Sequence, residues 1–368
     1  MIFNGQSYSQ KPACIITING VAALFTNVTV SSKNYYLSDT YEITLPLNKN
    51  GIFTLEYWGS IQNAEVKIYM GFQVNIDVFN IDDLNLIFTG AIDTIRMNVI
   101  EQIVTISGRD YSYLLIDKKT TKTYLNKTAS EIAIEFAQDN GLNSEVVPTT
   151  SPVGSYFNPF TLYSQTNINL TQWDYLTYLA QQINYNVYVK NKTLYFVPKP
   201  GPNTPFFEIP LQTANDFSLF PMAPGTSFNF YRTLTLAEDV LVKVNSASIF
   251  TGSSFTVSAT SHHIKDAVKA PKQTYVFSFP NLTEQEARNI AQAQLEAITH
   301  HEIVLEGVMP PHFDLNKNIP ILISGTNSNL DQLYYVDLLN ISLSYLPPKF
   351  EMSFNAKNHD VNTEVSIK

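Results

Sequence analysis

The sequence predicts a mainly β protein that carries an α+β insertion in its middle. Three observations lead to this prediction. Short runs of β-branched and aromatic residues, separated by turn signals, fill the first and last thirds of the 368-residue chain. The middle third contains two segments with the capping residues and the apolar stripe of amphipathic helices. A proline-rich stretch at 198–205 follows these helices and marks a boundary.

The first segment has the pattern of strands almost throughout. Its runs are separated by turn signals such as Asn48-Lys49-Asn50-Gly51. Many short strands with few helices favour a closed barrel or a sandwich. The last run has apolar residues on both faces, which fits a barrel wall that is covered on both sides. The expected strands are 15–18, 27–31, 41–47, 64–69, 73–79, 86–97 and 100–106.

The middle region contains two expected helices and a hairpin. Each helix begins with a Thr that is followed three residues later by an acidic residue, a capping box that satisfies two free N–H groups at the helix start. Gly141 follows the first helix, in the position where a left-handed residue ends a helix. The hairpin, 185–197, turns at Asn191-Lys192, because Asn tolerates positive φ. The capping pairs are Thr128 with Glu131 and Thr171 with Asp174.

The last segment returns to strands and carries one more helix. A third capping box, Thr283 with Glu286, opens a helix that is expected over 283–301. The prolines at 310–311 predict a turn, because Pro cannot donate to a sheet ladder. The expected strands are 239–244, 255–259, 302–308, 319–324, 334–344 and 350–355.

A weak internal echo links the two ends of the chain. Ile92-Asp93 precedes a strand, and Val336-Asp337 does the same in the last segment. Duplication of a β unit would produce this echo, and so would chance.

The chain is acidic and poor in charged residues. Its formal net charge is -9, and charged residues make up 15 per cent of it, against about 25 per cent in typical soluble proteins. The acidic balance argues against electrostatic binding to nucleic acid, which requires Lys and Arg to displace counterions. An acidic pore wall that repels phosphate would still let DNA slide through the pore. Uncharged polar surface suits a protein packed into an assembly, and an ordinary protein from a low-GC genome would look the same.

Cysteine usage and the chain start favour folding in a reducing cytoplasm. Cys14 is the only cysteine, so no intrachain disulfide forms. Residues 1–6 lack the features of a signal peptide. No apolar run approaches the ~20 residues that a membrane-spanning helix needs, so we expect no membrane insertion.

The sequence offers few candidates for catalysis or metal binding. His262-His263 and His300-His301 are the best metal candidates, but adjacent histidines point apart, whereas zinc needs three or four converging ligands. We find no nucleophile elbow, Walker loop or dinucleotide fingerprint. A carboxylate pair among the 32 acidic residues and a sugar-binding surface of Tyr and Phe stay open as alternatives. We expect no catalytic residue, no cofactor and no metal.

One stretch carries a resemblance to a known family. A strand that ends in Ser107-Gly108-Arg109-Asp110 is followed by an aromatic and aliphatic run, and then by the Thr-initiated helix that closes at 140–142. This layout resembles the baseplate hub proteins of contractile phage tails, the late control D or tail hub family, which is similar to the hub part of VgrG. The last helix and the strands at 319–325 and 334–337 resemble the same family. The final loop, 347–349, departs from it, because no family His precedes it.

The resemblance implies two tube-like β-barrel domains, 1–112 and 205–368, around a small α/β insertion domain, 113–204. It implies a non-enzymatic homotrimer, a ring with pseudo-sixfold symmetry that joins the tail tube protein to the central spike protein and contacts other baseplate proteins. DNA would pass through the lumen without specific binding. The protein would be assembled in the host cytoplasm and reside in the virion tail baseplate. The motif 107–110 would be structural rather than catalytic.

Two alternatives to this reading remain. A tail-associated cell-wall hydrolase would need a carboxylate pair or a metal site, and a glycan-binding tail protein would bind host polysaccharide. The sequence does not separate a phage from a pyocin-like or other injection device, and it does not identify the spike partner or the residues facing the lumen.

Overall fold

The computed structural model describes most of the chain. The described residues are 11–34, 36–48, 51–73, 81–120, 122, 124, 127–150, 153, 170–200, 204–212, 222–232, 240–247, 253–260, 273–279, 282–299, 303–358 and 364–367.

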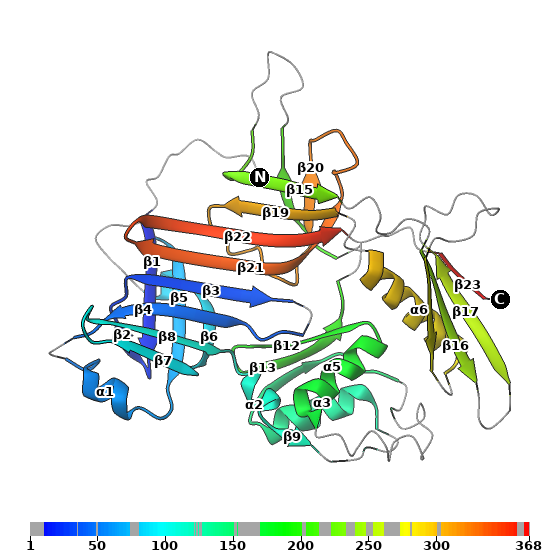
Figure 1. Cartoon of the computed structure of the whole chain (residues 1–368), viewed down its shortest axis with the longest axis horizontal. Coiled ribbons are helices and arrows are strands. Elements are labelled where there is room, and N and C mark those ends of the chain that lie inside the picture. Colours follow the sequence, from blue (N-terminus) through cyan, green and yellow to red (C-terminus); the bar gives the residue numbers. More distant parts are fainter. Residues whose placement is uncertain are drawn as a thin grey trace, which may run out of the picture.

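A ten-stranded sheet built from both ends of the chain is the largest element (Figure 1). Its neighbouring strands run antiparallel along the main path, and β14 and β20 extend it beside β21. The strands along the path are β15 (Ser227–Arg232), β19 (Ile303–Met309), β22 (Pro348–Asn358), β21 (Leu333–Tyr345), β3 (Asn27–Lys33), β4 (Thr40–Pro46), β8 (Ile103–Arg109) and β7 (Thr94–Asn98), and the two beside it are β14 (Phe207–Pro210) and β20 (Ile321–Ser324).

A smaller sheet crosses the first part of the large sheet (Figure 1). Alternate apolar residues on both sheets meet in one core, which contains Ile16 and Ile68 from the small sheet and Val30 and Ile341 from the large one. A short helix, α1 (Leu55–Ser60), adds Trp58 to this core. The small sheet consists of β2 (Val21–Ala23), β1 (Lys11–Ile18), β5 (Glu65–Gln73) and β6 (Asn85–Ala91), and a 3-10 turn, η1 (Ile81–Asp83), precedes β6.

The middle of the chain forms an α/β unit with its own core. Both predicted capping boxes are confirmed at Thr128 and Thr171, and Gly141 has φ +66°. Asn191 and Lys192 both have positive φ, as the predicted hairpin turn requires. The elements are α2 (Tyr113–Ile116), β9 (Lys119–Thr120), α3 (Ala129–Asp139), β10 (Asn143–Val146), β11 (Leu170–Thr171), α5 (Gln172–Gln182), β12 (Tyr185–Lys190) and β13 (Thr193–Pro198).

A third unit lies beside the insertion (Figure 1). The helix α6 (Glu284–Thr299) packs against a separate four-stranded sheet through Ala287, Ala291 and Leu295. The third capping box is present, since Thr283 N–H donates to Glu286 and Glu286 N–H donates to Thr283. The sheet contains β18 (Gln273–Ser278), β16 (Val240–Ala247), β17 (Ser254–Thr260) and β23 (Glu364–Ile367).

The predicted class, mainly β with an α+β insertion, is confirmed, but closed barrels are not seen in the described residues. The reason is that β3 pairs with β21, so strands from the two ends of the chain join one open sheet. The expected strand 86–97 is two strands, because β6 belongs to the small sheet and β7 to the large one. The expected strand 100–106 begins later, at Ile103, because Asn98 caps a turn by accepting the N–H groups of the next turn residues.

Candidate functional site

The large sheet contains the same arrangement of strands twice. Its order is β7-β8-β4-β3 followed by β21-β22-β19-β15. In the first set, the hairpin β7-β8 pairs through β8 with β4, and β4 pairs with the earlier strand β3. In the second set, the hairpin β21-β22 pairs through β22 with β19, and β19 pairs with the earlier strand β15. We call these sets the two halves of the sheet. They are joined head to tail by the pairing of β3 with β21.

The registers of the two hairpins match at the ends opposite their turns, although the second hairpin is longer. Thr94 faces Ser107 in the first half, and Leu338 faces Asn355 in the second. Immediately before these positions stand the two Asp residues of the sequence echo. Asp93 pairs with Arg109 at 2.7 Å, and Asp337 pairs with Lys357 at 2.6 Å. The echo therefore extends to a repeated ion pair at the same place in both hairpins.

The last residue of the sequence motif also has a counterpart. Asp110 is buried, and its Oδ2 accepts the N–H of Asp39, just before β4, at 3.1 Å. Asn358 is buried at the equivalent position, and its Oδ1 accepts the N–H of Ile303, at the start of β19, at 2.8 Å. In both halves this side chain holds the beginning of the neighbouring strand. The geometry supports the structural role proposed for Ser107, Gly108, Arg109 and Asp110.

A buried ionic cluster around Asp110 connects the first and last segments. Lys317 is 7 % exposed, and its Nζ contacts Asp39 Oδ1 at 2.6 Å and the carbonyl of Lys33 at 2.9 Å. The Asp110 carboxylate also accepts two hydrogen bonds from Ser112, one from its backbone N–H at 2.9 Å and one from its hydroxyl. Burial, with the nearby Asp39 carboxylate, raises the pKa of Asp110 to about 6.

Replacing Asp110 with Asn is expected to remove a pH dependence while keeping the fold. Because the folded-state pKa is raised, the contribution of this group to stability is fully present below about pH 4 and is lost as pH rises through about 6. We expect the free energy of unfolding of wild type, relative to D110N, to fall by about 2–3 kcal/mol over that window. Denaturant titrations at a series of pH values measure the difference.

The D110A variant is the control for the Asn358 comparison. Relative to D110N, it should be less stable by about 3 kcal/mol at every pH in that window, because it leaves the N–H groups of Asp39 and Ser112 without their acceptor. A D110N protein that is as unstable as D110A would contradict the equivalence with Asn358.

Two edges and one face of the large sheet stay open within the described part of the chain. β7 and β15 end the strand path, each with a strand on one side only. The face turned away from the core carries hydroxyl and amide side chains at many alternate positions, with charged ones such as Glu42, Glu351 and Lys357 among them, and most are partly exposed. The uncharged ones include Thr29, Ser31, Thr105, Asn340, Ser342 and Ser353.

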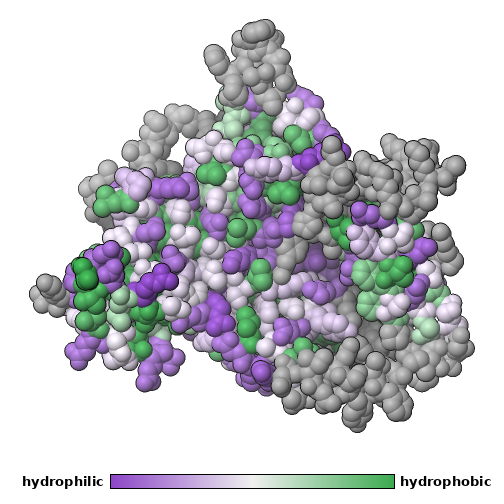
Figure 2. Space-filling view, viewed as in Figure 1, coloured by the Kyte–Doolittle hydropathy of each residue, from purple (hydrophilic) through white to green (hydrophobic). Residues whose placement is uncertain are grey.

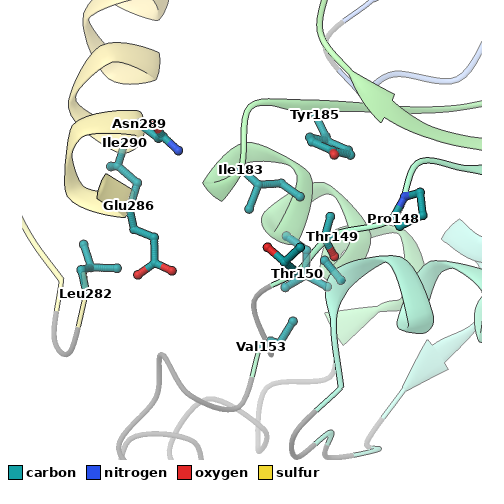
Figure 3. A pocket seen from close by; sticks show the side chains of 12 residues that line it. Pro148, Thr149, Thr150, Val153, Ile183, Tyr185, Leu282, Glu286, Asn289 and Ile290 are labelled. Carbon is teal, nitrogen blue, oxygen red and sulfur yellow. The ribbon is translucent and has the colours of Figure 1, made fainter. Parts of the chain in front are cut away.

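A cavity of about 240 Å³ lies between the insertion and α6 (Figure 3). Apolar side chains such as Ile183 and Ile290 line both sides of it. Two of its polar groups already have hydrogen-bond partners. The Glu286 carboxylate accepts the N–H of Thr283, and the Thr149 hydroxyl donates to the Ser130 hydroxyl. We interpret the cavity as a joint between two units rather than a ligand site.

The histidine pairs suggested as metal candidates, 262–263 and 300–301, lie outside the described residues. Within the described residues no group of three His, Cys, Asp or Glu side chains is placed to hold a metal ion. Over the same ranges, no helix has the length and apolar character needed to cross a membrane. Sequence analysis found the motif at 107–110 but missed the open edges, since these depend on pairings between distant segments.

Solved structures with the same overall fold include tail proteins and a component of the type VI secretion system. A tail protein from Neisseria meningitidis MC58 is 13% identical with a TM-score of 0.63, over 94% of this chain and 96% of that one. The 43 kDa tail protein of prophage MuSo2 from Shewanella oneidensis is 12% identical with a TM-score of 0.66, over 95% and 99%. An E. coli component of the type VI secretion system is 8% identical with a TM-score of 0.53, over 94% and 77%.

These likenesses define the class of fold. The chain has the fold of phage tail proteins and of a type VI secretion component that is itself described as similar to bacteriophage T4 tail proteins. The resemblance to the hub family is therefore confirmed at the level of the fold. No protein-family model matches the sequence, and a search of curated proteins found no match.

Proposed function

We propose that this protein is a structural, non-enzymatic subunit of the baseplate hub in a contractile tail, located in the virion and assembled in the host cytoplasm. Three copies form a ring that joins the tail tube to the central spike. The observation that carries this proposal is the repeated strand arrangement. Two equivalent halves per chain give six similar units in a trimer, so one ring would match sixfold and threefold partners.

The junction between copies would copy the junction inside the chain. Inside the chain, β3 of the first half pairs with β21 of the second. The counterpart of β3 is β15, the counterpart of β21 is β7, and both lie at open edges of the described sheet. Pairing of β15 with β7 of the next copy would continue the sheet around the ring. Closure would also cover edges that otherwise invite aggregation.

The matching registers predict which residues face each other across this junction. Within the chain, Ser31 on β3 faces Asn340 on β21. Ser31 pairs with Thr40, which pairs with Arg109. Tyr231 pairs with Val304, which pairs with Lys357. Because Arg109 and Lys357 occupy equivalent places in the two hairpins, Ser31 corresponds to Tyr231. Asn340 corresponds to Arg96. Arg96 of one copy should therefore face Tyr231 of the next copy.

The open face of the sheet supports a role in conducting DNA. Its hydroxyl and amide side chains carry no charge, Arg109 and Lys357 on the same face are paired with Asp93 and Asp337, and the chain carries a net charge of -9, so little positive charge is left to hold phosphate. We propose that this face lines the lumen and that DNA passes without specific binding. We also propose that 1–112 and 205–368 form the ring as two domains, with 113–204 as an insertion domain outside it that meets other baseplate proteins.

A pair of cysteines at the proposed junction is expected to link three chains. The R96C/Y231C variant, treated with a short thiol-reactive cross-linker, should give bands of two and three chains on a denaturing gel. The native thiol should not interfere, because burial raises the pKa of Cys14 to about 12 and keeps it protonated.

The matched control for this cross-link shifts one residue. In M97C/Y231C the two side chains would point to opposite faces of the sheet, so linking should be weak. Equal linking in both variants, or a ladder that continues beyond three chains, would contradict the proposed junction.

A further inference from the structure

A cavity of about 200 Å³ lies between the stretch that follows α1 and the start of β7. It is lined by residues 61–64 and by Ile92, Asp93 and Ile95, and we call it the β7 cavity. Because β7 ends the strand path of the described sheet, the cavity lies beside the proposed junction between copies. Figure 2 shows apolar and polar residues mixed on the lower left surface, where Figure 1 draws α1 and β7.

The second half of the sheet contains an equivalent place. β5 and β20 each pair with the strand that leads to the Asp of the repeated ion pair. Val66 on β5 and Ile321 on β20 both face a residue three positions before that Asp. The stretch 61–64 before β5 therefore corresponds to the stretch 316–319 before β20.

In the second half this place is occupied by Asn34, the residue that follows β3. The backbone N–H of Asn34 donates to the carbonyl of Asp337 at 2.8 Å. Its side-chain amide donates to the carbonyls of Val336 at 2.9 Å and of Lys317 at 3.2 Å. Asn34 thus fastens the end of the β3–β21 pairing, which is the junction inside the chain.

The equivalent carbonyl groups of the first half belong to Asp93, Ile92 and Gln62. All three residues line the β7 cavity. Among the described residues, no N–H group outside the strand ladders donates to any of these carbonyls. The described chain therefore contains the acceptors of this site twice, but the residue that uses them only once.

The residue that would use the second set of acceptors is Leu234 of the next copy. Ser31 corresponds to Tyr231, so Asn34, three residues after Ser31, corresponds to Leu234. Leu234 lies outside the described residues, and its place in the junction follows from the pairing of β15 with β7. Its N–H would reach the Asp93 carbonyl, and its side chain would enter the cavity.

The lining of the β7 cavity suits Leu better than Asn. Ile61, Ile92 and Ile95 pack against the core, and all three also line the cavity. Ile61 stands at the place that the polar Asn316 has in the second half. Burial of a Leu side chain against such groups is favourable, whereas a buried amide would need hydrogen-bond partners for each of its polar atoms.

We propose that the β7 cavity receives Leu234 of the next copy and fastens each junction between copies, as Asn34 fastens the junction inside the chain. This inference rests on the proposed function, since it requires the pairing of β15 with β7 around a ring. One residue of each copy would then fill a site that the next copy leaves open.

The L234D variant of the full chain tests this contact. A carboxylate in the cavity would lose its water and lie close to carbonyl oxygens. We therefore expect L234D to form trimers only at concentrations at least about 30-fold above those that wild type needs. Sedimentation over a series of concentrations measures the difference.

A second substitution provides the matched test of place. Q62K introduces the residue type that Lys317 supplies at this position in the second half, so L234D/Q62K should form trimers within about 5-fold of the wild-type concentration. Q62K alone should change little, because Gln62 is exposed. V276D, which adds a carboxylate at an exposed residue of β18, should leave trimer formation unchanged.

The outcomes separate the two claims. An L234D chain that forms trimers as readily as wild type would overturn the contact while leaving the ring intact. An L234D chain that Q62K does not restore would also overturn it, because the loss would then arise outside this cavity. A wild-type chain that forms no trimer, alone or with its tube and spike proteins, would contradict the proposed function itself.

Discussion

Replacing Lys317 with Met is expected to lower the free energy of unfolding by about 3–5 kcal/mol at neutral pH. The change keeps the length of the side chain but removes the only positive group that contacts the Asp39 carboxylate among the described residues. Asp39 and the buried Asp110 would then repel each other without compensation. The loss should shrink as pH falls, because protonation of Asp110 removes one of the two charges.

Denaturant unfolding of R288M provides the matched comparison. Arg288 pairs with Glu284 at 3.1 Å on an exposed face of α6. Losing such a pair costs at most about 0.5 kcal/mol. If K317M and R288M change stability equally, the cluster does not hold the first and last segments together.

Replacing Gly108 with Ala is expected to cost about 3 kcal/mol or more. A Cβ at this position would lie 1.9 Å from the carbonyl oxygen of Ala91, and one at Gly90 would lie 2.2 Å from the carbonyl oxygen of Arg109. Both obstacles are backbone atoms of the two sheets where they meet. The small and large sheets would have to separate there to admit a methyl group.

The control for this prediction is Gly59 in α1, where a Cβ would meet no atom within 4 Å. G59A should leave stability unchanged or raise it by up to about 1 kcal/mol, because Ala favours the helix more than Gly. Thermal and denaturant unfolding of both variants measure the difference. A stable G108A protein would contradict the close contact between the sheets.

Local features of the fold were predictable from the sequence because their causes are local. The capping boxes at Thr128, Thr171 and Thr283 each depend on residues three apart. The hairpin turn at Asn191 depends on one residue that tolerates positive φ. The short helix α1 was missed, because its six residues show no helical period long enough to recognise.

The sheet arrangement was not predictable, because it depends on pairings between distant segments. β3 and β21 lie some 300 residues apart in sequence, and periodicity does not tell which strands will pair. For the same reason 86–97 was expected to be one strand, although its two parts enter different sheets. The motif at 107–110 was identified, but its counterpart at Asn358 is visible only once the registers of both hairpins are known.

The solution mass of the purified chain, with electron microscopy of the same fraction, tests the central claim most directly. We predict a particle of three times the chain mass, seen as a ring with a central hole and six similar units. A chain that stays single at high concentration, and also when mixed with its tube and spike proteins, would contradict the proposed ring.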